Sequence, residues 1–399
     1  GAYARGLSGK GVKLGDIDDG TYRYHPEFSE AGKFIALNTQ GVRTLDDPYN
    51  PNDPKNARGQ PFNLDGGMPY FGLFGGKYKF DAHGTHTGGT IAAQRDHSDG
   101  GMFGVAWGST LYATNGAGLG PNLGTIDTFD PAIFATEVDQ LIASHVIAIN
   151  NSWGISPLKG KQPWQLPDVI DQYVTDTTHL NLDAAERAAK AGVVMVFSAG
   201  NEYGSQSDAM NGLPYFRPDP EIEQHFVGVA NLKDINSLNS TSSVCGYTKY
   251  WCVSAPGTNI LSAVVTGEPD HLKSDYDGTY SGTSMAAPHV TGALGLLAER
   301  YSYLTTAQLR EVMLTTARDL GAAGVDSTFG WGRPNLDKAM NGPGQFLGRV
   351  EANLSTGEND TWSNDISQVA LDQRKREETD ETAGWAKRKK EKGWESGIG

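Results

Sequence analysis

The residues Tyr280–Gly292 read YSGTSMAAPHVTG and lead into an apolar run that is typical of a helix. Ser284 is therefore expected at a helix N-terminus. There the N–H groups without intrahelical partners and the positive end of the helix dipole suit a nucleophile and its oxyanion. Gly282, two residues earlier, allows a close approach of another backbone. The alternative is that Thr283 or Ser284 only caps the helix, which is a common role for these residue types.

Two histidines in the segment DAHGTHTGGT (81–90) are candidates for the base that a serine nucleophile needs. His83 and His86 are three residues apart, so they share one face if the segment is helical. The base must be a neutral imidazole, and a carboxylate must fix its tautomer and stabilise the imidazolium. Asp18 and Asp19, in GDIDDG (15–20), end a predicted strand and offer that carboxylate.

A side-chain amide follows another predicted strand, in SAGNE (198–202). The amide of Asn201 is able to donate a hydrogen bond to an oxyanion. In open parallel sheets, ligands bind beyond the carboxyl ends of the strands. Because all four segments lie at the end of a predicted strand or the start of a predicted helix, we expect them to converge on one crevice.

The alternation of short apolar runs with amphipathic stretches predicts the fold class. Asp130 followed by Pro131 marks a helix start, and Gly192 is placed to end the helix LDAAERAAK. The short apolar runs are Val12–Ile17, Thr90–Ala93, Leu111–Thr114, Val146–Ile149, Val193–Phe197 and Phe226–Ala230, and two later helices are expected at Thr283–Tyr301 and Thr306–Leu320. Continuous apolar strands between helices predict an α/β fold of three layers, a mostly parallel sheet flanked by helices on both faces.

Three stretches break this alternation and are expected to form long loops: Thr44–Phe80, Ile155–His179 and Glu202–Gln224. Long loops within a compact domain are more often functional than accidental. After about Asn341 the sequence becomes dense in charge. We therefore predict one domain over residues 1–341 and a charged, helical extension over 342–399. That extension is either a solvated helix or linker, or a segment that docks its tryptophans on a neighbouring module.

Composition excludes several classes of protein. The 399 residues carry a formal net charge of −14, which disfavours binding to nucleic-acid phosphates. The longest apolar stretches fall far short of the roughly 20 residues that a membrane-spanning helix needs. The sequence begins at Gly1 without a signal-like segment, so we expect that a leader has been removed or that the sequence is a fragment.

The chain has two cysteines, Cys245 and Cys252, in a spacing that does not match a zinc site. A disulfide between them would close a ring of about eight residues and contribute roughly 2–2.5 kcal/mol in the chain-entropy model. The alternative is a pair of free thiols, one or both buried. We favour the disulfide because a removed leader and an extracellular setting go together.

The four segments together resemble the subtilisin-like serine peptidases (subtilases, peptidase family S8) over roughly residues 8–340, in the order Asp, His, Ser of subtilisin. The resemblance implies a catalytic acid, base and nucleophile and an oxyanion donor at Asp18, His83, Ser284 and Asn201, respectively. His86 then becomes a structural residue of its helix. The segment Ser152, Trp153 and Gly154 resembles the family segment that pairs with the substrate backbone.

This resemblance implies a secreted or cell-surface serine endopeptidase that matures or degrades surface and host proteins through an acyl-enzyme. VCGYTKYWCVSAPG (244–257) and FGWGRPNLDKAM (329–340) look like parts of the subtilase passenger domains of Gram-negative autotransporters. That finer resemblance implies display on, or release from, the outer membrane. It also implies a stalk and a membrane barrel in the full-length chain, with residues 342–399 leading toward the stalk. A removed N-terminal propeptide is a further expectation.

The resemblance leaves the ligands and the specificity open. Glu202, beside Asn201, either favours a basic residue at P1 or is a solvated carboxylate. We expect no cofactor for the chemistry, and calcium is considered only as a structural ion. Oxygen-rich clusters suit calcium but also make ordinary turns; they comprise Asp46, Asp47, Asn50, Asn52 and Asp53 in one loop and Asp96 and Asp99 in another.

Two other functions compete with the peptidase. One is a catalytically inactive binding or adhesion module on the same fold, against which the presence of all four chemical residues argues. The other is a metallohydrolase that uses Asp81, His83 and His86. It lacks an HExxH motif or a third distant histidine in a comparable motif.

Overall fold

A computed structural model describes residues 1–43, 57–74, 77–95, 101–116, 130–154, 180–268 and 271–342. The expected loop Ile155–His179, the suggested calcium clusters and residues 343–399 of the predicted extension lie outside these ranges.

A parallel seven-stranded sheet forms the centre of the described fold. Every neighbouring pair of its strands runs in the same direction. In spatial order, the strands are β11 (Cys252–Pro256), β10 (Phe226–Leu232), β9 (Val194–Ser198), β8 (Ala148–Asn151), β1 (Lys13–Asp18), β7 (Thr110–Asn115) and β2 (Phe34–Ala36). The strands are apolar on both sides because helices cover both faces of the sheet.

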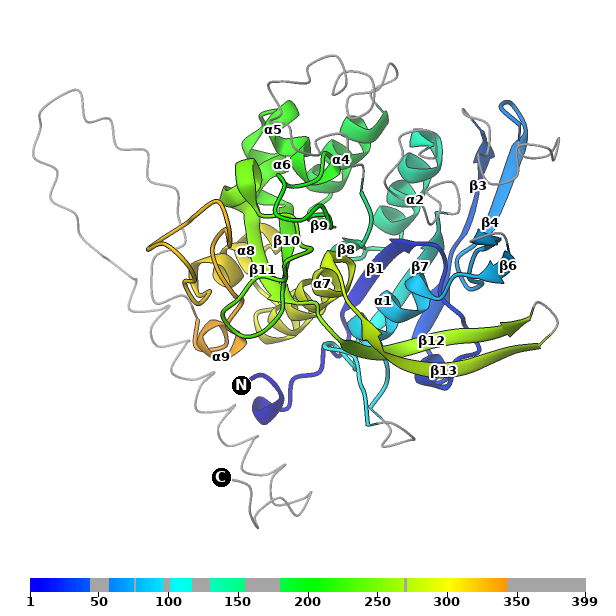
Figure 1. Ribbon diagram of the computed structural model, residues 1–399, viewed down its shortest axis with the longest axis horizontal. Coiled ribbons are helices and arrows are strands. Elements are labelled where there is room, and N and C mark those ends of the chain that lie inside the picture. Colours follow the sequence, from blue (N-terminus) through cyan, green and yellow to red (C-terminus); the bar gives the residue numbers. More distant parts are fainter. Residues whose placement is uncertain are drawn as a thin grey trace, which may run out of the picture.

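The longer helices form the outer layers (Figure 1). Their bounds are α1 (His83–Ala92), α2 (Pro131–Ala143), α4 (Leu180–Lys190), α7 (Thr283–Arg300) and α8 (Thr306–Thr315). One core cluster joins Leu14 of the sheet to α1, α7 and α8, and a second joins Ile17 to α2 and α4. Neighbouring residues of β1 therefore face opposite layers, and the predicted three-layer α/β fold is confirmed.

Local signals explain where several helices start and stop. Asp130 accepts a hydrogen bond from the N–H of Ala132 at the start of α2, as a capping residue does. Gly192 follows α4 with φ of 72°, a conformation that glycine adopts readily. Thr305 and Gln308 form a capping box at the start of α8. This helix ends at Thr315, five residues before the predicted Leu320.

Some expectations about local structure are wrong. The apolar run Thr90–Ala93 does not form a separate strand. Thr90 to Ala92 are the last residues of α1, and Ala93 is its C-cap. The described part of the expected loop Thr44–Phe80 contains three strands, and Glu202–Gln224 contains short helices. The strands are only four or five residues long and the helices consist of single turns, so none of these elements shows a clear hydrophobic periodicity. They are β4 (Pro61–Asp65), β5 (Phe71–Phe74) and β6 (Lys77–Phe80) in the first stretch, and η7 (Met210–Gly212), α5 (Leu213–Phe216) and α6 (Pro220–Gln224) in the second.

Antiparallel hairpins surround the sheet. β3 (Asn38–Val42) pairs with β4, and β5 pairs with β6. β12 (Ile260–Glu268) and β13 (His271–Tyr280) form a long hairpin that extends away from the sheet in Figure 1. The remaining short elements are η1 (Tyr3–Arg5), η2 (Pro26–Phe28), η8 (Gly246–Trp251) and α9 (Leu336–Ala339).

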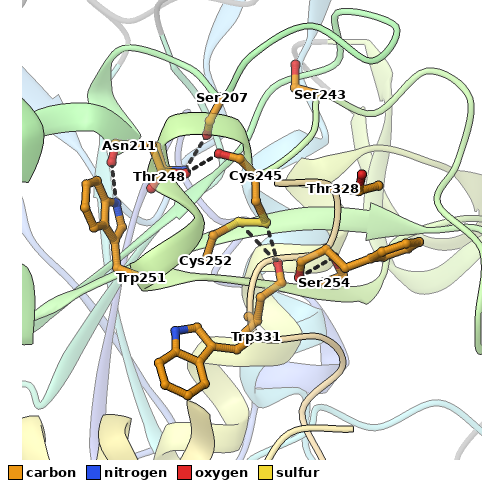
Figure 2. Close-up of a disulfide and its surroundings, with 12 residues drawn as sticks. Ser207, Asn211, Ser243, Cys245, Thr248, Trp251, Cys252, Ser254, Thr328 and Trp331 are labelled. Atoms are coloured by element: carbon orange, nitrogen blue, oxygen red, sulfur yellow. Dashed lines mark hydrogen bonds between the residues drawn. A yellow bond between two sulfur atoms is a disulfide. The ribbon is translucent and has the colours of Figure 1, made fainter. Parts of the chain in front are cut away.

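The two cysteines are joined by a disulfide, with 5.7 Å between their Cα atoms. Figure 2 shows the bond between Cys245, just before η8, and Cys252, at the start of β11, with Trp251 to its left and Trp331 below it. The indole N–H of Trp251 donates to the carbonyl of Asn211 at 2.9 Å. The disulfide therefore closes a short loop that packs on the edge of the main sheet.

Candidate active site

The carboxyl ends of the central strands carry the predicted acid and base. Asp18 is the last residue of β1, and His83 is the first residue of α1. The Oδ1 atom of Asp18 lies 2.8 Å from Nδ1 of His83. Asp18 is only 5% exposed, and the same Oδ1 accepts the backbone N–H of Asp19 at 2.8 Å. A buried carboxylate thus fixes the imidazole and leaves its Nε2 atom as the remaining site for a proton.

Two further carboxylates hold the first turn of α1. The N–H of His83 donates to Asp81 Oδ1 at 3.0 Å, and the N–H of Gly84 donates to Asp19 Oδ1 at 2.7 Å. These bonds satisfy N–H groups that have no partner within the helix. Residue 84 has to be glycine because an added Cβ would lie 2.5 Å from the carbonyl oxygen of Gly20. The turn therefore packs directly against the end of β1.

The carboxylates set the pKa of His83. Burial alone would lower it, but the charge and hydrogen bond of Asp18, with the charge of Asp81, outweigh burial and raise the pKa to about 9. The imidazolium form is therefore strongly stabilised at this position. Such stabilisation is what a base needs when it takes up a proton during a reaction.

His86 has a different environment from His83. Its Nε2 atom lies 2.8 Å from the carbonyl oxygen of Ile260, and its ring stacks on Tyr280 with 4.6 Å between centroids. Burial lowers the pKa of His86 to about 4, so this ring stays neutral. The structure thus brings His83, and not His86, to Asp18.

Ser284 lies in the first turn of α7, which packs against α1. Its hydroxyl donates to the backbone carbonyl of Ser152 at 2.8 Å, and the Ser152 hydroxyl donates to the Ser284 carbonyl at 2.7 Å. That carbonyl is available because Pro288, four residues later, has no N–H to donate to it. Among the hydrogen bonds of the described residues, none joins Ser284 to His83.

The capping alternative for Ser284 is not supported. The N-cap of α7 is Gly282, and no side chain forms a cap hydrogen bond. The neighbouring hydroxyl, that of Thr283, instead accepts the N–H of Gly200 at 3.1 Å. Ser284 is half-buried at the surface of the site. Its hydroxyl is therefore not consumed by the helix terminus.

The side chain of Asn201 is oriented by Thr283. Its Oδ1 atom accepts the Thr283 N–H at 3.0 Å and the Thr283 hydroxyl at 3.2 Å. With Oδ1 held in this way, the Nδ2 donor of this exposed side chain points elsewhere. Thr283 and Met285 donate their N–H groups within the protein, whereas the structure records no partner for the Ser284 N–H among the described residues. Among the described residues, the Nδ2 group of Asn201 and the N–H of Ser284 are thus two donors without a recorded acceptor.

The segment after β8 contributes structure as well as backbone groups. Trp153 is buried, donates its indole N–H to the carbonyl of Ile17 at 3.0 Å, and packs edge-on against Phe134 and Phe197. Its side chain is therefore part of the core. Ser152 is fully buried beneath Ser284. The side chains of Ser152 and Trp153 are therefore not exposed at the site, whereas Gly154 is half-buried.

Sequence reasoning missed three polar residues beneath the site: Asp16, Thr87 and Asn150. All three are completely buried, and Thr87 and Asn150 are each hydrogen-bonded to Asp16. A carboxyl group at an inward position of a buried strand is costly without partners, so Asp16 was a usable signal. Its partners come from α1 and β8, and no local pattern links them to it.

The metal alternative does not match the geometry. Within the described ranges, the group of acidic and histidine side chains close enough to share an ion is Asp18, Asp19 and His83. This group differs from the proposed set, which paired His83 with Asp81 and His86. Asp18 and His83 already contact each other through a hydrogen bond, and His86 contacts Ile260. The described residues therefore give no support to a metallohydrolase.

None of the described helices combines the length and the apolar character required to cross a bilayer.

The sequence was compared with family profiles, with known proteins and with solved structures. The profile of the "Subtilase family" matches residues 9–332. An extracellular serine protease of Serratia marcescens is 35% identical over 393 residues, which cover 87% of this chain and 33% of that protein.

Two further similarities concern a surface protein and a solved structure. The Neisserial autotransporter lipoprotein NalP of Neisseria meningitidis is 34% identical over 168 residues, covering 39% of this chain and 14% of NalP. The crystal structure of fervidolysin from Fervidobacterium pennivorans, a keratinolytic enzyme related to subtilisin, matches with a TM-score of 0.56 and 25% identity. It covers 86% of this chain and 45% of that one. The chain thus spans about a third or less of the length of these two curated relatives.

Proposed function

The chain belongs to the subtilase family of serine proteases, and from this premise we propose that it is an extracellular serine endopeptidase that cleaves proteins through an acyl-enzyme. The observation that carries the proposal is the 2.8 Å contact between Asp18 and His83 at the end of β1, beside the helix that begins with Thr283 and Ser284. The order acid, base, nucleophile and the oriented amide of Asn201 support it.

In the proposed reaction, Ser284 attacks the peptide carbonyl while His83 takes the hydroxyl proton. The hydroxyl first turns from the Ser152 carbonyl toward the imidazole, since catalytic hydrogen bonds often form only when substrate is bound. Asp18 holds the ring and stabilises the imidazolium. His83 then returns the proton to the leaving amine. A water molecule, activated by the same base, releases the acyl group.

The negative oxygen that develops on the substrate carbonyl needs donors that are already in place. We assign this role to the Asn201 amide and the Ser284 backbone N–H. Thr283 supports the assignment because it binds the oxygen of the Asn201 amide and so turns the nitrogen toward the site. The backbone from Ser152 to Gly154 offers an edge along which an extended peptide can pair.

The cellular setting follows from the relatives. One relative is an extracellular serine protease and another is an autotransporter lipoprotein, so we propose secretion or display at the surface of a Gram-negative bacterium. Because the chain spans a minor part of these relatives, a stalk, a membrane barrel and a removed propeptide are proposed for the full-length protein. Residues 1–341 form the proposed peptidase domain, and 342–399 the proposed extension. The chemistry described above requires no cofactor.

The test is labelling with a fluorophosphonate probe, followed by mass spectrometric mapping of the adduct. We expect one adduct on Ser284 in the wild type and none in Ser284→Ala, with far-ultraviolet circular dichroism showing that both are folded. A folded wild type without label contradicts the proposal and favours the hypothesis of a catalytically inactive binding or adhesion module. Labelling that persists in EDTA supports a metal-independent nucleophile, whereas an adduct on another residue refutes the assignment.

A further inference from the structure

Asp16 lies two residues before Asp18 on β1, so both carboxyl groups point to the same face of the sheet. This face is covered by α1 and α7, the helices that begin with His83 and Thr283. Asp16 is completely buried. A carboxyl group removed from water in this way requires hydrogen-bond partners, and its partners all belong to segments that carry the candidate site.

The first partner lies on the helix of the base. The hydroxyl of Thr87 is 2.9 Å from Asp16 Oδ2, 3.2 Å from the carbonyl oxygen of Gly84 and 3.5 Å from Asp18 Oδ2. Thr87 follows His83 by four residues, so the two side chains lie on one face of α1. Asp16 therefore links the strand of the acid to the helix of the base.

The second partner leads to the nucleophile. Asn150 donates one amide hydrogen to Asp16 Oδ1 at 2.8 Å and the other to the Ser152 hydroxyl at 2.9 Å. The Ser152 hydroxyl donates in turn to the carbonyl of Ser284 at 2.7 Å. This acceptor exists because Pro288 cannot bind it. Both amide hydrogens of Asn150 are used, so the chain from Asp16 to the backbone of Ser284 is complete.

We propose that Asp16 is a positioning residue that holds the segments of Asp18, His83 and Ser284 in register through Thr87 and Asn150. This inference rests on the proposed peptidase function, because the register matters only if those three residues act together. Asp16 does not touch the reacting atoms. A displacement of about 1 Å among reacting groups lowers a rate by roughly 10²-fold, so such positioning has a measurable effect.

The protonation state of Asp16 follows from its surroundings. Burial and the charge of Asp18 raise its pKa to about 8, against the opposing hydrogen bonds of Asn150 and Thr87 and the charge of His83. The charged and titratable groups that face it are Asp18 on its own strand and His83 on α1. Burial and the charge of Asp18 thus favour the neutral carboxylic acid, whose proton the Thr87 hydroxyl can accept while it donates its own hydrogen to the carbonyl of Gly84.

The kinetic test compares Asp16→Ala, Asp16→Asn, Thr87→Val and Thr87→Ser on a peptide substrate, with active-site titration of each sample. Asp16→Ala should lower kcat roughly 10- to 100-fold with little change in KM. Asp16→Asn should retain kcat within about threefold, since a neutral amide reproduces both hydrogen bonds. Thr87→Val should lose activity that Thr87→Ser retains. Leu309→Ala, in the buried face of α8, is the control for a destabilised core with the network intact.

The proposal is overturned if Asp16→Ala keeps the kcat of the wild type, or loses no more than Leu309→Ala. It is also overturned if Asp16→Asn loses as much as Asp16→Ala. Should Asp16→Ala fail to fold, the Thr87 pair decides by the same criterion. Labelling of the wild type at Ser284 is measured first, so that a failure of the proposed function is seen there and not in the Asp16 series.

A second measurement does not depend on activity. The folded state keeps the proton of Asp16 up to about pH 8, whereas an unfolded aspartate loses it near pH 4. The stability that this proton brings is complete below pH 4 and is lost as the pH rises through 8. The Tm of Asp16→Asn minus that of the wild type should therefore increase between pH 5 and pH 9. A difference that stays constant over this range would show that Asp16 is already ionised in the folded protein at pH 5, and would refute its role as a neutral acid.

Discussion

The two sides of the candidate site are built from different chemistry. On the acid side, the four carboxyl groups of Asp16, Asp18, Asp19 and Asp81 surround His83. On the oxyanion side, neutral amide and hydroxyl groups orient one another and leave two donors facing outward. The acid side must stabilise a proton that moves onto a ring, and this requires charge. The oxyanion side must stabilise charge that appears on the substrate, and fixed dipoles achieve this without a counterion.

The acid side also shows how strongly position decides the behaviour of one residue type. His83 and His86 are three residues apart on α1. The first has its pKa raised to about 9 by Asp18, and the second has its pKa lowered to about 4 by burial. Because the two side chains are chemically identical, the difference between their pKa values comes from their surroundings. Sequence spacing alone gives no such distinction.

The largest expected effect comes from the carboxylate of the acid side. Asp18→Asn should lower kcat roughly 10⁴-fold, the order found for the corresponding change in subtilisin and trypsin, because the amide no longer stabilises the imidazolium. Peptide hydrolysis assays with active-site titration measure this loss of kcat. Asp19→Asn is the matched control, since an amide oxygen still accepts the N–H of Gly84, and it should lose far less. Equal losses in both variants would remove the special role of Asp18.

The oxyanion side should respond next in size. Asn201→Ala should lower kcat about 10²- to 10³-fold with KM little changed, the magnitude seen for the matching donor of subtilisin. Thr283→Val, which removes one of two hydrogen bonds to the Asn201 oxygen, should have a smaller effect of the same kind. Full activity of Asn201→Ala would place the oxyanion donor elsewhere.

The pH dependence should separate the two sides. Neutral His83 is required, and its pKa is raised above 6.5 toward 9, so kcat/KM should fall about tenfold per pH unit below that raised value. Asp81→Asn keeps the oxygen that accepts the His83 N–H but removes a charge, so it should move this limb to lower pH. Asn201→Ala, on the neutral side, should leave the limb in place. A wild-type limb at or below pH 6.5 would contradict the charge arrangement.

The smallest expected effect on activity concerns the disulfide. The segment just before its loop adjoins the oxyanion side, because the N–H of Ser243 donates to the carbonyl of Gly200 at 2.8 Å. Replacing Cys245 and Cys252 together by serine should lower the free energy of unfolding by about 2–2.5 kcal/mol, from the short loop that the bond closes. Denaturant unfolding measures this change. The acid limb of the pH profile should be unaffected, and a shifted limb would show that the two sides are coupled.

Much of the site was readable from local patterns. GTSMAAPHVTG placed Ser284 at a helix start, and Asp130 with Pro131 placed the start of α2 correctly. The antiparallel strand pairs are harder to predict from the sequence, because β4, β5 and β6 lie in a stretch rich in Pro and Gly. The partner of β4 is β3, which lies well before it in the sequence. The apolar run Thr90–Ala93 does not by itself indicate a helix, since the glycines before it hide the periodicity of α1.

Local periodicity and short motifs are enough to predict the family, the layered α/β architecture and the residues for acid, base and nucleophile, with His83 as the base that the resemblance implies. The packed structure adds the contact of His83 with Asp18 and the hydrogen bond of the Ser284 hydroxyl to the Ser152 carbonyl. It also decided that Asp16 joins Thr87 and Asn150 beneath the site. These outcomes depend on the desolvation of groups from separate strands and helices and on the contacts between them. Neither arises until the sheet and its covering helices have packed.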